Sequence, residues 1–144
     1  DVYKRQPVRL AKVVKKGRVW GIDIEPNLVN YLNQRAKKES LNNLFSILGT
    51  YNDPLIPEKV DYIFIVNTYH HISHRKEYFS KLRDSLKVGG KIVIIDFKKG
   101  KLPLGPKDKM KISSTEIIRE LRDAGYSKIS AFKILKYQNF LVFN

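Results

Sequence analysis

The sequence predicts an α/β domain with a doubly wound, mostly parallel sheet that ends in an antiparallel hairpin. Apolar segments of strand length alternate with helical patterns along the chain, which is the order found in parallel sheets. The strongest strand segment, residues 60–66, is apolar nearly throughout, as expected when helices cover both faces. The last two strand segments, 128–135 and 137–143, are joined too tightly for a parallel crossover and must be antiparallel.

The composition is that of one globular domain. The chain has 144 residues, of which 42% are hydrophobic and 11% aromatic, and it contains no internal repeat. No apolar run approaches the roughly 18 residues of a membrane span, and the N-terminus lacks the apolar core of a signal peptide. Cysteine is absent, which excludes disulfides, thiolate catalysis and zinc–sulfur sites. We therefore expect a cytoplasmic protein.

The net charge of +14 is the unusual feature of the composition. Such a charge attracts nucleic acid, acidic lipid or anionic substrates. The lysines are spread from Lys4 to Lys136, however, with the densest group at 98–111, and no arginine cluster is interleaved with aromatic residues. A solvated lysine-rich surface is favoured over a functional anionic partner.

The first third of the chain predicts a helix tail, a strand, a helix and a second strand. Residues 8–15 have the pattern of an amphipathic helix that ends at Gly17. Residues 18–24 form a short apolar strand segment that finishes on an acid, and Pro26 suits the first turn of a helix. Residues 44–48 are the next strand candidate. The apolar positions at helical spacing after Pro26 are Leu28, Val29, Leu32 and Ala36.

The middle of the chain predicts two buried strands with a helix between them. The strand at 60–66 is followed by a helix at about 75–86. The pair Gly89-Gly90 is expected to break the chain before a second buried strand at 91–97.

After a lysine-rich loop, the pair Ser113 and Glu116 has the spacing of a capping box at a helix start. This helix is expected to end at Gly125 and leads to the terminal hairpin. Its inward positions are Ile117, Ile118, Leu121 and Ala124.

In open α/β sheets, ligands bind outside the carboxyl ends of the strands, so the residue that ends the first strand is a candidate. Asp23 occupies this place. Its carboxylate can accept two hydrogen bonds from the vicinal hydroxyls of a ribose. The alternative is an acid favoured by the dipole of the helix that begins at Pro26, and the residues alone do not separate the two. Ile24 is either a contact for a purine face or part of the core.

Asn52 and Asp53 follow the strand at 44–48 and offer groups that can bind an adenine edge, with Tyr51 as a face for it. Asn-Asp-Pro is also ordinary turn chemistry, and the local pattern favours the turn.

Polar residues also follow the strand at 60–66. Asn67, Thr68, His70 and His71 come next in the chain, and polar groups at the top of a central strand are costly to bury. We expect them to line a cofactor and substrate cleft. A metal site is not favoured, although His74 completes three histidines within five positions, because no carboxylate accompanies them at ligand spacing.

These strand ends, in this order, resemble the class I S-adenosylmethionine-dependent methyltransferases, and more narrowly the small-molecule methyltransferases of the quinone-biosynthesis type. The helix, Gly-Gly turn and buried strand at 82–96 are the most specific part. The resemblance runs from about Pro7 to the C-terminus and implies a Rossmann-like sheet in the order 3-2-1-4-5-7-6, with strand 7 antiparallel. The segments that carry it are Arg18-Val-Trp-Gly-Ile-Asp-Ile-Glu-Pro26, residues 60–66, Tyr69-His-His-Ile72 and residues 82–96.

The resemblance implies S-adenosylmethionine as the cofactor. Asp23 would bind the ribose hydroxyls and Ile24 would lie next to the adenine. Asp53, with Asn52, would lie at the adenine amino group.

The same resemblance places Asn67 and Thr68 at the methionine half of the cofactor and His71 near the methyl donor or the acceptor. If the acceptor loses a proton, His71 or His70 is the candidate base, because histidine titrates near neutral pH. The acceptor would be a small molecule, anionic or quinone-like.

The sequence departs from the family at its start. Members have a strand and a glycine-rich loop before the helix that corresponds to 8–15, and only residues 1–6 precede it here. We expect residues 1–6 to be a non-native leader and residues 7–144 to be an incomplete domain that lacks its first strand and glycine loop. That strand would lie between 18–24 and 60–66, so its absence would leave the edges of these two strands unpaired. We therefore expect the chain to be marginally stable and to show weak or no cofactor binding and activity.

Two other functions are compatible with parts of the pattern. A non-catalytic module that binds nucleic acid would use the basic surface, and its affinity would fall steeply with salt. A nicotinamide dehydrogenase would share the acid at the end of a strand, but the terminal hairpin and the Tyr-His-His segment argue against it.

Overall fold

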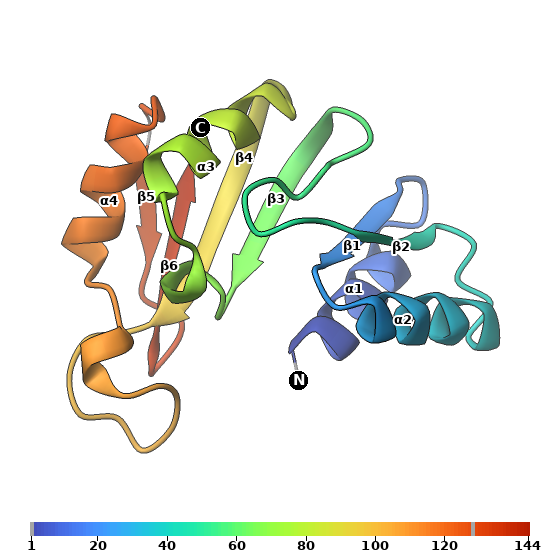
Figure 1. The fold of residues 1–144 in the computed structure, drawn as a ribbon, viewed down its shortest axis with the longest axis horizontal. Coiled ribbons are helices and arrows are strands. Elements are labelled where there is room, and N and C mark those ends of the chain that lie inside the picture. The colour runs from blue at the N-terminus through green and yellow to red at the C-terminus, as the bar shows by residue number, and fades with distance from the viewer. Residues whose placement is uncertain (1, 128) are drawn as a thin grey trace. The chain divides into compact units, whose positions relative to one another are not determined.

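The computed structural model describes residues 2–127 and 129–144, and the chain divides into two compact units, Asp1–Pro57 and Glu58–Asn144 (Figure 1). Each unit has its own sheet. Asp1 of the predicted leader and Lys128, at the start of the predicted strand 128–135, lie outside the described residues.

The first unit is a parallel two-stranded sheet with two helices on one face. Strands β1 and β2 pair in register from Val19↔Leu44 to Asp23↔Leu48, while α1 and α2 contact each other and both strands. The elements are α1 (Val2–Val13), β1 (Val19–Asp23), α2 (Pro26–Lys38) and β2 (Leu44–Leu48). Their shared core consists of Val8, Ala11, Leu32, Ala36 and Leu44.

Helix α1 runs through the predicted leader: residues 2–6 belong to it, and it ends at Val13 instead of residue 15. The side chain of Asn43 stabilises its C-terminal end by donating to the backbone carbonyls of Ala11 at 3.0 Å and Val14 at 2.9 Å. The last carbonyls of a helix have no partner within the helix, so this amide satisfies groups that would otherwise need water.

The second unit is a four-stranded sheet in the order β3-β4-β6-β5. Strands β3 and β4 are parallel, and β6 is antiparallel to both of its neighbours, so the predicted antiparallel strand near the edge is confirmed. The elements are β3 (Val60–Val66), η1 (Tyr69–His71), α3 (Arg75–Asp84), β4 (Leu86–Phe97), η2 (Asp108–Met110), α4 (Ser114–Asp123), β5 (Ile129–Phe132) and β6 (Gln138–Phe143).

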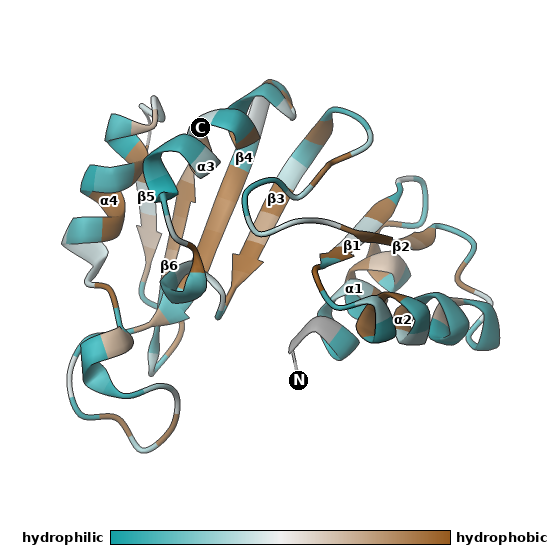
Figure 2. Ribbon diagram, viewed as in Figure 1, coloured by the Kyte–Doolittle hydropathy of each residue, from teal (hydrophilic) through white to brown (hydrophobic). Residues whose placement is uncertain are grey.

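Helices α3 and α4 lie side by side on one face of this second sheet, because they contact each other and the strands beneath them. The strands are largely hydrophobic, as Figure 2 shows for β3, β4 and β6. The largest fully buried side chains of this unit include Tyr69, Phe79, Leu82, Ile92, Ile94, Ile117, Leu121, Tyr126 and Phe143.

The predicted chain break at Gly89-Gly90 is a bulge inside a longer strand. Strand β4 begins at Leu86, and its register with β3 shifts between the pairs Val60↔Leu86 and Tyr62↔Lys91. Gly89 has a φ of 76°, in the left-handed region that glycine enters without strain. The glycines therefore bend the strand instead of ending it.

The predicted start and end of α4 are confirmed. The Ser113 hydroxyl accepts a hydrogen bond from the backbone N–H of Glu116 at 3.2 Å, as in a capping box. Gly125, which follows the helix, has a φ of 96°. Ile117 and Leu121 are fully buried.

Among the residues that the structure describes, no helix is long and apolar enough to cross a membrane.

Candidate functional site

Asp23, at the end of β1, is half-buried and holds the start of α2. One carboxylate oxygen accepts a hydrogen bond from the backbone N–H of Glu25 at 3.0 Å. This contact fits the interpretation of Asp23 as an acid that stabilises the N-terminus of the following helix. The other oxygen has no hydrogen-bond partner among the described residues, so it remains an acceptor for a ligand. Ile24 beside it is half-buried.

The loop after β2 is a closed turn that lies against the end of β1. The Asp53 backbone carbonyl accepts hydrogen bonds from the N–H and the hydroxyl of Thr50, and its carboxylate accepts from the N–H of Leu55 at 2.8 Å. The turn interpretation therefore describes the local structure. Asn52 is exposed, and Asp53 has one carboxylate oxygen engaged within the loop.

Gly49 brings this loop close to Asp23. Its N–H donates to the backbone carbonyl of Asp23 at 2.9 Å. A Cβ at this position would lie 2.9 Å from the side chain of Ile22 and 3.0 Å from the carbonyl oxygen of Pro54, so a larger residue would push the loop away. The structure thus brings together the two predicted ribose-side and adenine-side segments.

Asn67 and Thr68 follow β3. The N–H of Asn67 donates to the carbonyl of Ile95 at 2.8 Å, and its side-chain oxygen accepts from the amide of Gln138 on β6. Only the amide nitrogen of Asn67 is left to donate to a ligand. Thr68 is exposed, and its hydroxyl donates to the carbonyl of Val66 at 3.0 Å.

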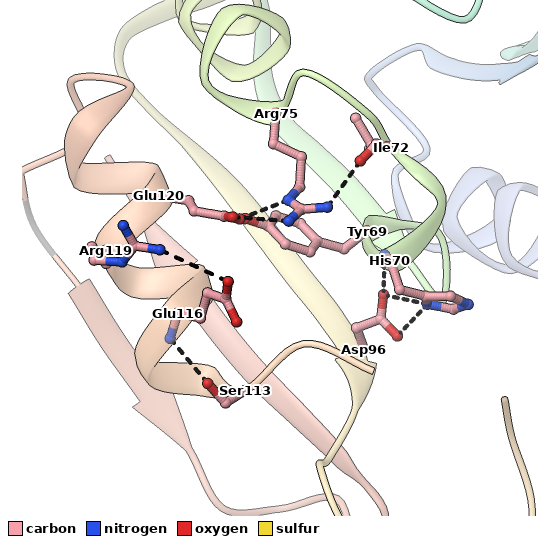
Figure 3. Close-up of polar contacts among 9 residues, drawn as sticks. All are labelled: Tyr69, His70, Ile72, Arg75, Asp96, Ser113, Glu116, Arg119 and Glu120. Carbon is pink, nitrogen blue, oxygen red and sulfur yellow. Dashed lines mark hydrogen bonds and ion pairs between the residues drawn. The ribbon is translucent and has the colours of Figure 1, made fainter. Parts of the chain in front are cut away.

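His70 forms a buried pair with Asp96 (Figure 3). Its Nδ1 lies 2.9 Å from Oδ1 and 3.0 Å from Oδ2 of Asp96, and the two side chains are 4% and 5% exposed. The backbone N–H groups of His70 and Phe97 also donate to the carboxylate, at 3.2 and 2.7 Å. Asp96 therefore receives donors from both η1 and β4.

His71 is exposed, and its ring packs against that of His70 with the centroids 4.1 Å apart. Within residues 2–127 and 129–144, no group of three or more His, Cys, Asp or Glu side chains could hold a metal ion.

Tyr69 anchors the segment that carries these histidines. Its ring is fully buried and stacks on Phe79 at 5.2 Å, and its hydroxyl donates to the Glu120 carboxylate. Arg75 donates to both oxygens of Glu120, at 2.7 and 2.8 Å, and to the carbonyl of Ile72 at 3.0 Å. The network joins η1 to α3 and α4 (Figure 3).

Electrostatics favour the ionised form of Glu120. Burial by itself would raise the pKa of Glu120, but the hydrogen bonds from Arg75 and Tyr69 outweigh it and hold the pKa below its ordinary value. Burial, followed by the adjacent carboxylate, raises the pKa of Tyr69, so its hydroxyl stays a donor.

Asp96, Gln138, Glu120 and Arg75 were not among the predicted site residues. Asp96 could have been predicted from the sequence, because it lies near the end of the predicted strand at 91–97, as Asp23 does in the strand at 18–24. The other three belong to segments that the sequence does not connect with the Tyr-His-His motif.

The lysine-rich loop at 98–113 uses several of its ammonium groups internally. Lys98 donates to the carbonyl of Leu135 at 2.8 Å, and Lys99 donates to that of Lys111 at 3.1 Å. Lys111 is 4% exposed and donates to the carbonyl of Gly100 at 2.7 Å. These three lysines hold the loop, which weakens the case for a nucleic-acid surface here.

Comparison with known proteins gives a consistent family assignment. A family model for a methyltransferase domain matches residues 6–138. The chain is similar to a crystal structure of an S-adenosylmethionine-dependent methyltransferase from Aquifex aeolicus, with a TM-score of 0.85 and 29% sequence identity. That match covers 94% of this chain and 73% of the other. No curated protein sequence matches the chain.

Two further structures share the fold. The glycopeptide N-methyltransferase MtfA, in complex with S-adenosylmethionine, has a TM-score of 0.73 and 10% identity over 95% of this chain and 75% of that one. The S-adenosylmethionine-dependent methyltransferase SibL in its apo form has a TM-score of 0.74 and 13% identity over 98% of this chain and 47% of that one. The predicted α/β fold class is confirmed.

Proposed function

The chain belongs to the methyltransferase-domain family, and on that premise we propose that it takes part in methyl transfer from S-adenosylmethionine to a small-molecule acceptor. The observation that carries the proposal is the family match across residues 6–138, together with polar groups at the ends of β1, β2 and β3. S-adenosylmethionine supplies a methyl group that is already activated on sulfur, so the protein has mainly to align the acceptor and exclude water.

The groups at the ends of β1 and β2 fit the nucleoside part of this cofactor. Ribose hydroxyls are donors, and Asp23 has a carboxylate oxygen without a partner among the described residues. Asn52 and Asp53, on the loop that Gly49 holds against β1, would bind the adenine amino group, and Ile24 would contact the ring.

The residues after β3 would serve the methionine and acceptor side. The amide nitrogen of Asn67 and the hydroxyl of Thr68 are polar groups available there. Of the two candidate bases, His70 is favoured over His71, because its ring is held by Asp96 whereas His71 is exposed.

Titration of ¹⁵N-labelled protein with S-adenosylhomocysteine tests the nucleoside assignment, since amide chemical shifts detect weak binding. We expect concentration-dependent shifts at residues 23–25 and 49–55, and at least tenfold weaker binding in Asp23→Ala. The matched control is Asp61→Ala, whose side chain is 70% exposed and pairs with Lys87. Shifts scattered over surface lysines, or equal binding by both variants, would contradict the assignment.

A further inference from the structure

The contacts of Asp96 determine where His70 carries its proton. The carboxylate receives the backbone N–H groups of His70 and Phe97 and lies within 3.0 Å of Nδ1 through both oxygens. A carboxylate only accepts hydrogen bonds, so Nδ1 must be the donor. A neutral imidazole with its proton on Nδ1 has a lone pair on Nε2.

That lone pair is not used within the described part of the chain. No described residue hydrogen-bonds to Nε2, although Nδ1 has two contacts. No fully buried side-chain nitrogen or oxygen among those residues lacks a partner, so Nε2 is not completely enclosed, although the His70 side chain is only 4% exposed. Figure 3 shows this nitrogen at the side of the ring that points away from Asp96.

The ring has little freedom to turn. Tyr69, immediately before it, is fixed by Phe79 and Glu120, and the His70 backbone is tied to Asp96. A buried ionic or polar pair contributes little net stability compared with apolar residues of similar volume. Stability alone therefore gives a weak reason for this arrangement, whereas an oriented base gives a direct one.

We propose that Asp96 is a positioning residue that holds His70 as the Nδ1–H tautomer, and that Nε2 of His70 is the base of the methyl transfer. This proposal rests on the proposed function. Nε2 takes the proton from the acceptor atom while that atom forms its bond to the methyl carbon, and the electrons of the broken carbon–sulfur bond stay on sulfur. Asp96 stabilises the resulting imidazolium, which then releases its proton to water.

The step specifies a class of acceptor. The nucleophilic atom must carry a hydrogen that it loses on methylation, as a hydroxyl, an amine or an acidic carbon does. A thioether or a tertiary amine has no such proton and gains nothing from Nε2. The acceptors of this protein therefore belong to the first group.

The tautomer can be observed without cofactor or acceptor. In long-range ¹H–¹⁵N correlation spectra of histidine-labelled protein at mildly alkaline pH, we expect His70 to have a protonated Nδ1 and an unprotonated Nε2. Asp96→Asn replaces one acceptor oxygen by an NH₂ donor of nearly the same shape, so the proton should move to Nε2. A wild-type ring protonated on Nε2, or an unchanged tautomer in Asp96→Asn, would overturn the proposal.

Diethyl pyrocarbonate, which acylates unprotonated imidazole nitrogen, supplies a chemical readout by mass spectrometry. We expect His70 to react in the wild type and at least fivefold more slowly in Asp96→Asn, where Nε2 is protonated and Nδ1 is buried. The exposed His71 and His74 are internal controls and should react at unchanged rates. An equal rate at His70 in both proteins would overturn the proposal.

The two hypotheses fail in different ways. Absence of S-adenosylhomocysteine binding contradicts the proposed function but leaves the His70 tautomer as measured. A wrong tautomer contradicts the role of Asp96 but leaves cofactor binding intact.

Discussion

The polar side chains at the ends of β1 and β2 form hydrogen bonds with neighbours in the sequence, whereas those that follow β3 form them with distant residues. Asp23 and Asp53 each accept a hydrogen bond from an N–H two positions away. His70 is 26 positions from Asp96, and Tyr69 is 51 positions from Glu120.

This difference separates two kinds of polar site. A carboxylate in a local turn is partly exposed and keeps an oxygen for a ligand, and its loss disturbs only a few residues. The carboxylates that join η1 to a strand or a helix are less accessible: Asp96 is buried, and the Glu120 side chain is 17% exposed. Their removal leaves other groups without partners. Substitutions should therefore affect stability much more in the second unit than at the strand ends of the first.

The largest effect is expected for Glu120→Ala. It removes the partner of Arg75 and of the Tyr69 hydroxyl, and we expect peptides within residues 58–144 to lose about 3 kcal/mol of protection in native-state hydrogen exchange. Glu116→Ala is the control, because this carboxylate is 44% exposed and 3.8 Å from Arg119; its effect should stay below about 0.5 kcal/mol. Equal losses of protection in Glu120→Ala and Glu116→Ala would contradict the expectation that carboxylates with distant partners matter more for stability.

Glu120 should also make the second unit sensitive to acid. A carboxylate with a lowered pKa in the folded state contributes stability above its unfolded pKa of about 4.3 and loses it as the pH falls through the folded pKa. Hydrogen exchange of residues 58–144 between about pH 5 and pH 2.5 should show this loss, and Glu120→Gln should flatten it. An unchanged slope in the variant would assign the acid sensitivity to other groups.

Gly49→Ala should have an intermediate effect in the first unit. The new Cβ would press on Ile22 and Pro54, so we expect a loss of about 1–2 kcal/mol in urea unfolding. Trp20, the single tryptophan, lies in β1 and reports this unit by fluorescence. An unchanged free energy of unfolding in Gly49→Ala would mean that the loop after β2 can move away from β1 without cost.

Asp53→Ala should have the smallest effect. It removes one side-chain hydrogen bond to the N–H of Leu55 in an exposed turn, and we expect a loss of about 1 kcal/mol or less by Trp20 fluorescence. A loss above about 3 kcal/mol would show that the carboxylate has a wider structural role and would remove the contrast between the two regions.

The sequence predicted most of the elements because their signals are local. The strands at 44–48 and 60–66 have the predicted bounds, since an apolar run between breakers is a local signal. The prediction that both faces of 60–66 are covered was wrong, because Tyr62 and Phe64 are 55% and 44% exposed. Ser113 and Gly125 marked the ends of α4 through capping chemistry that acts over three or four residues. The bulge at Gly89 was missed because it exists only in relation to the partner strand.

For the candidate site, the sequence selected residues that follow strands but not the side chains that contact them. It selected Asp23, Asp53 and the histidines, and at Asp53 the local pattern favoured a turn, which the structure contains. It did not select Asp96, although an acid at the end of a buried strand is a visible signal. The pairing of Asp96 with His70 was beyond sequence reasoning, because it depends on the register of β4 beside β3.

By itself the sequence determined the α/β class, the order of strands and helices, the terminal antiparallel hairpin and the resemblance to methyltransferases. Apolar periodicity, caps and turns act over a few residues, so the linear pattern contains them. Only the tertiary structure decided which nitrogen of His70 faces Asp96, which carboxylate holds Arg75, and which lysines are used inside the loop at 98–113. These contacts join residues that are far apart in the chain, and they exist only once the sheet and its helices have assembled.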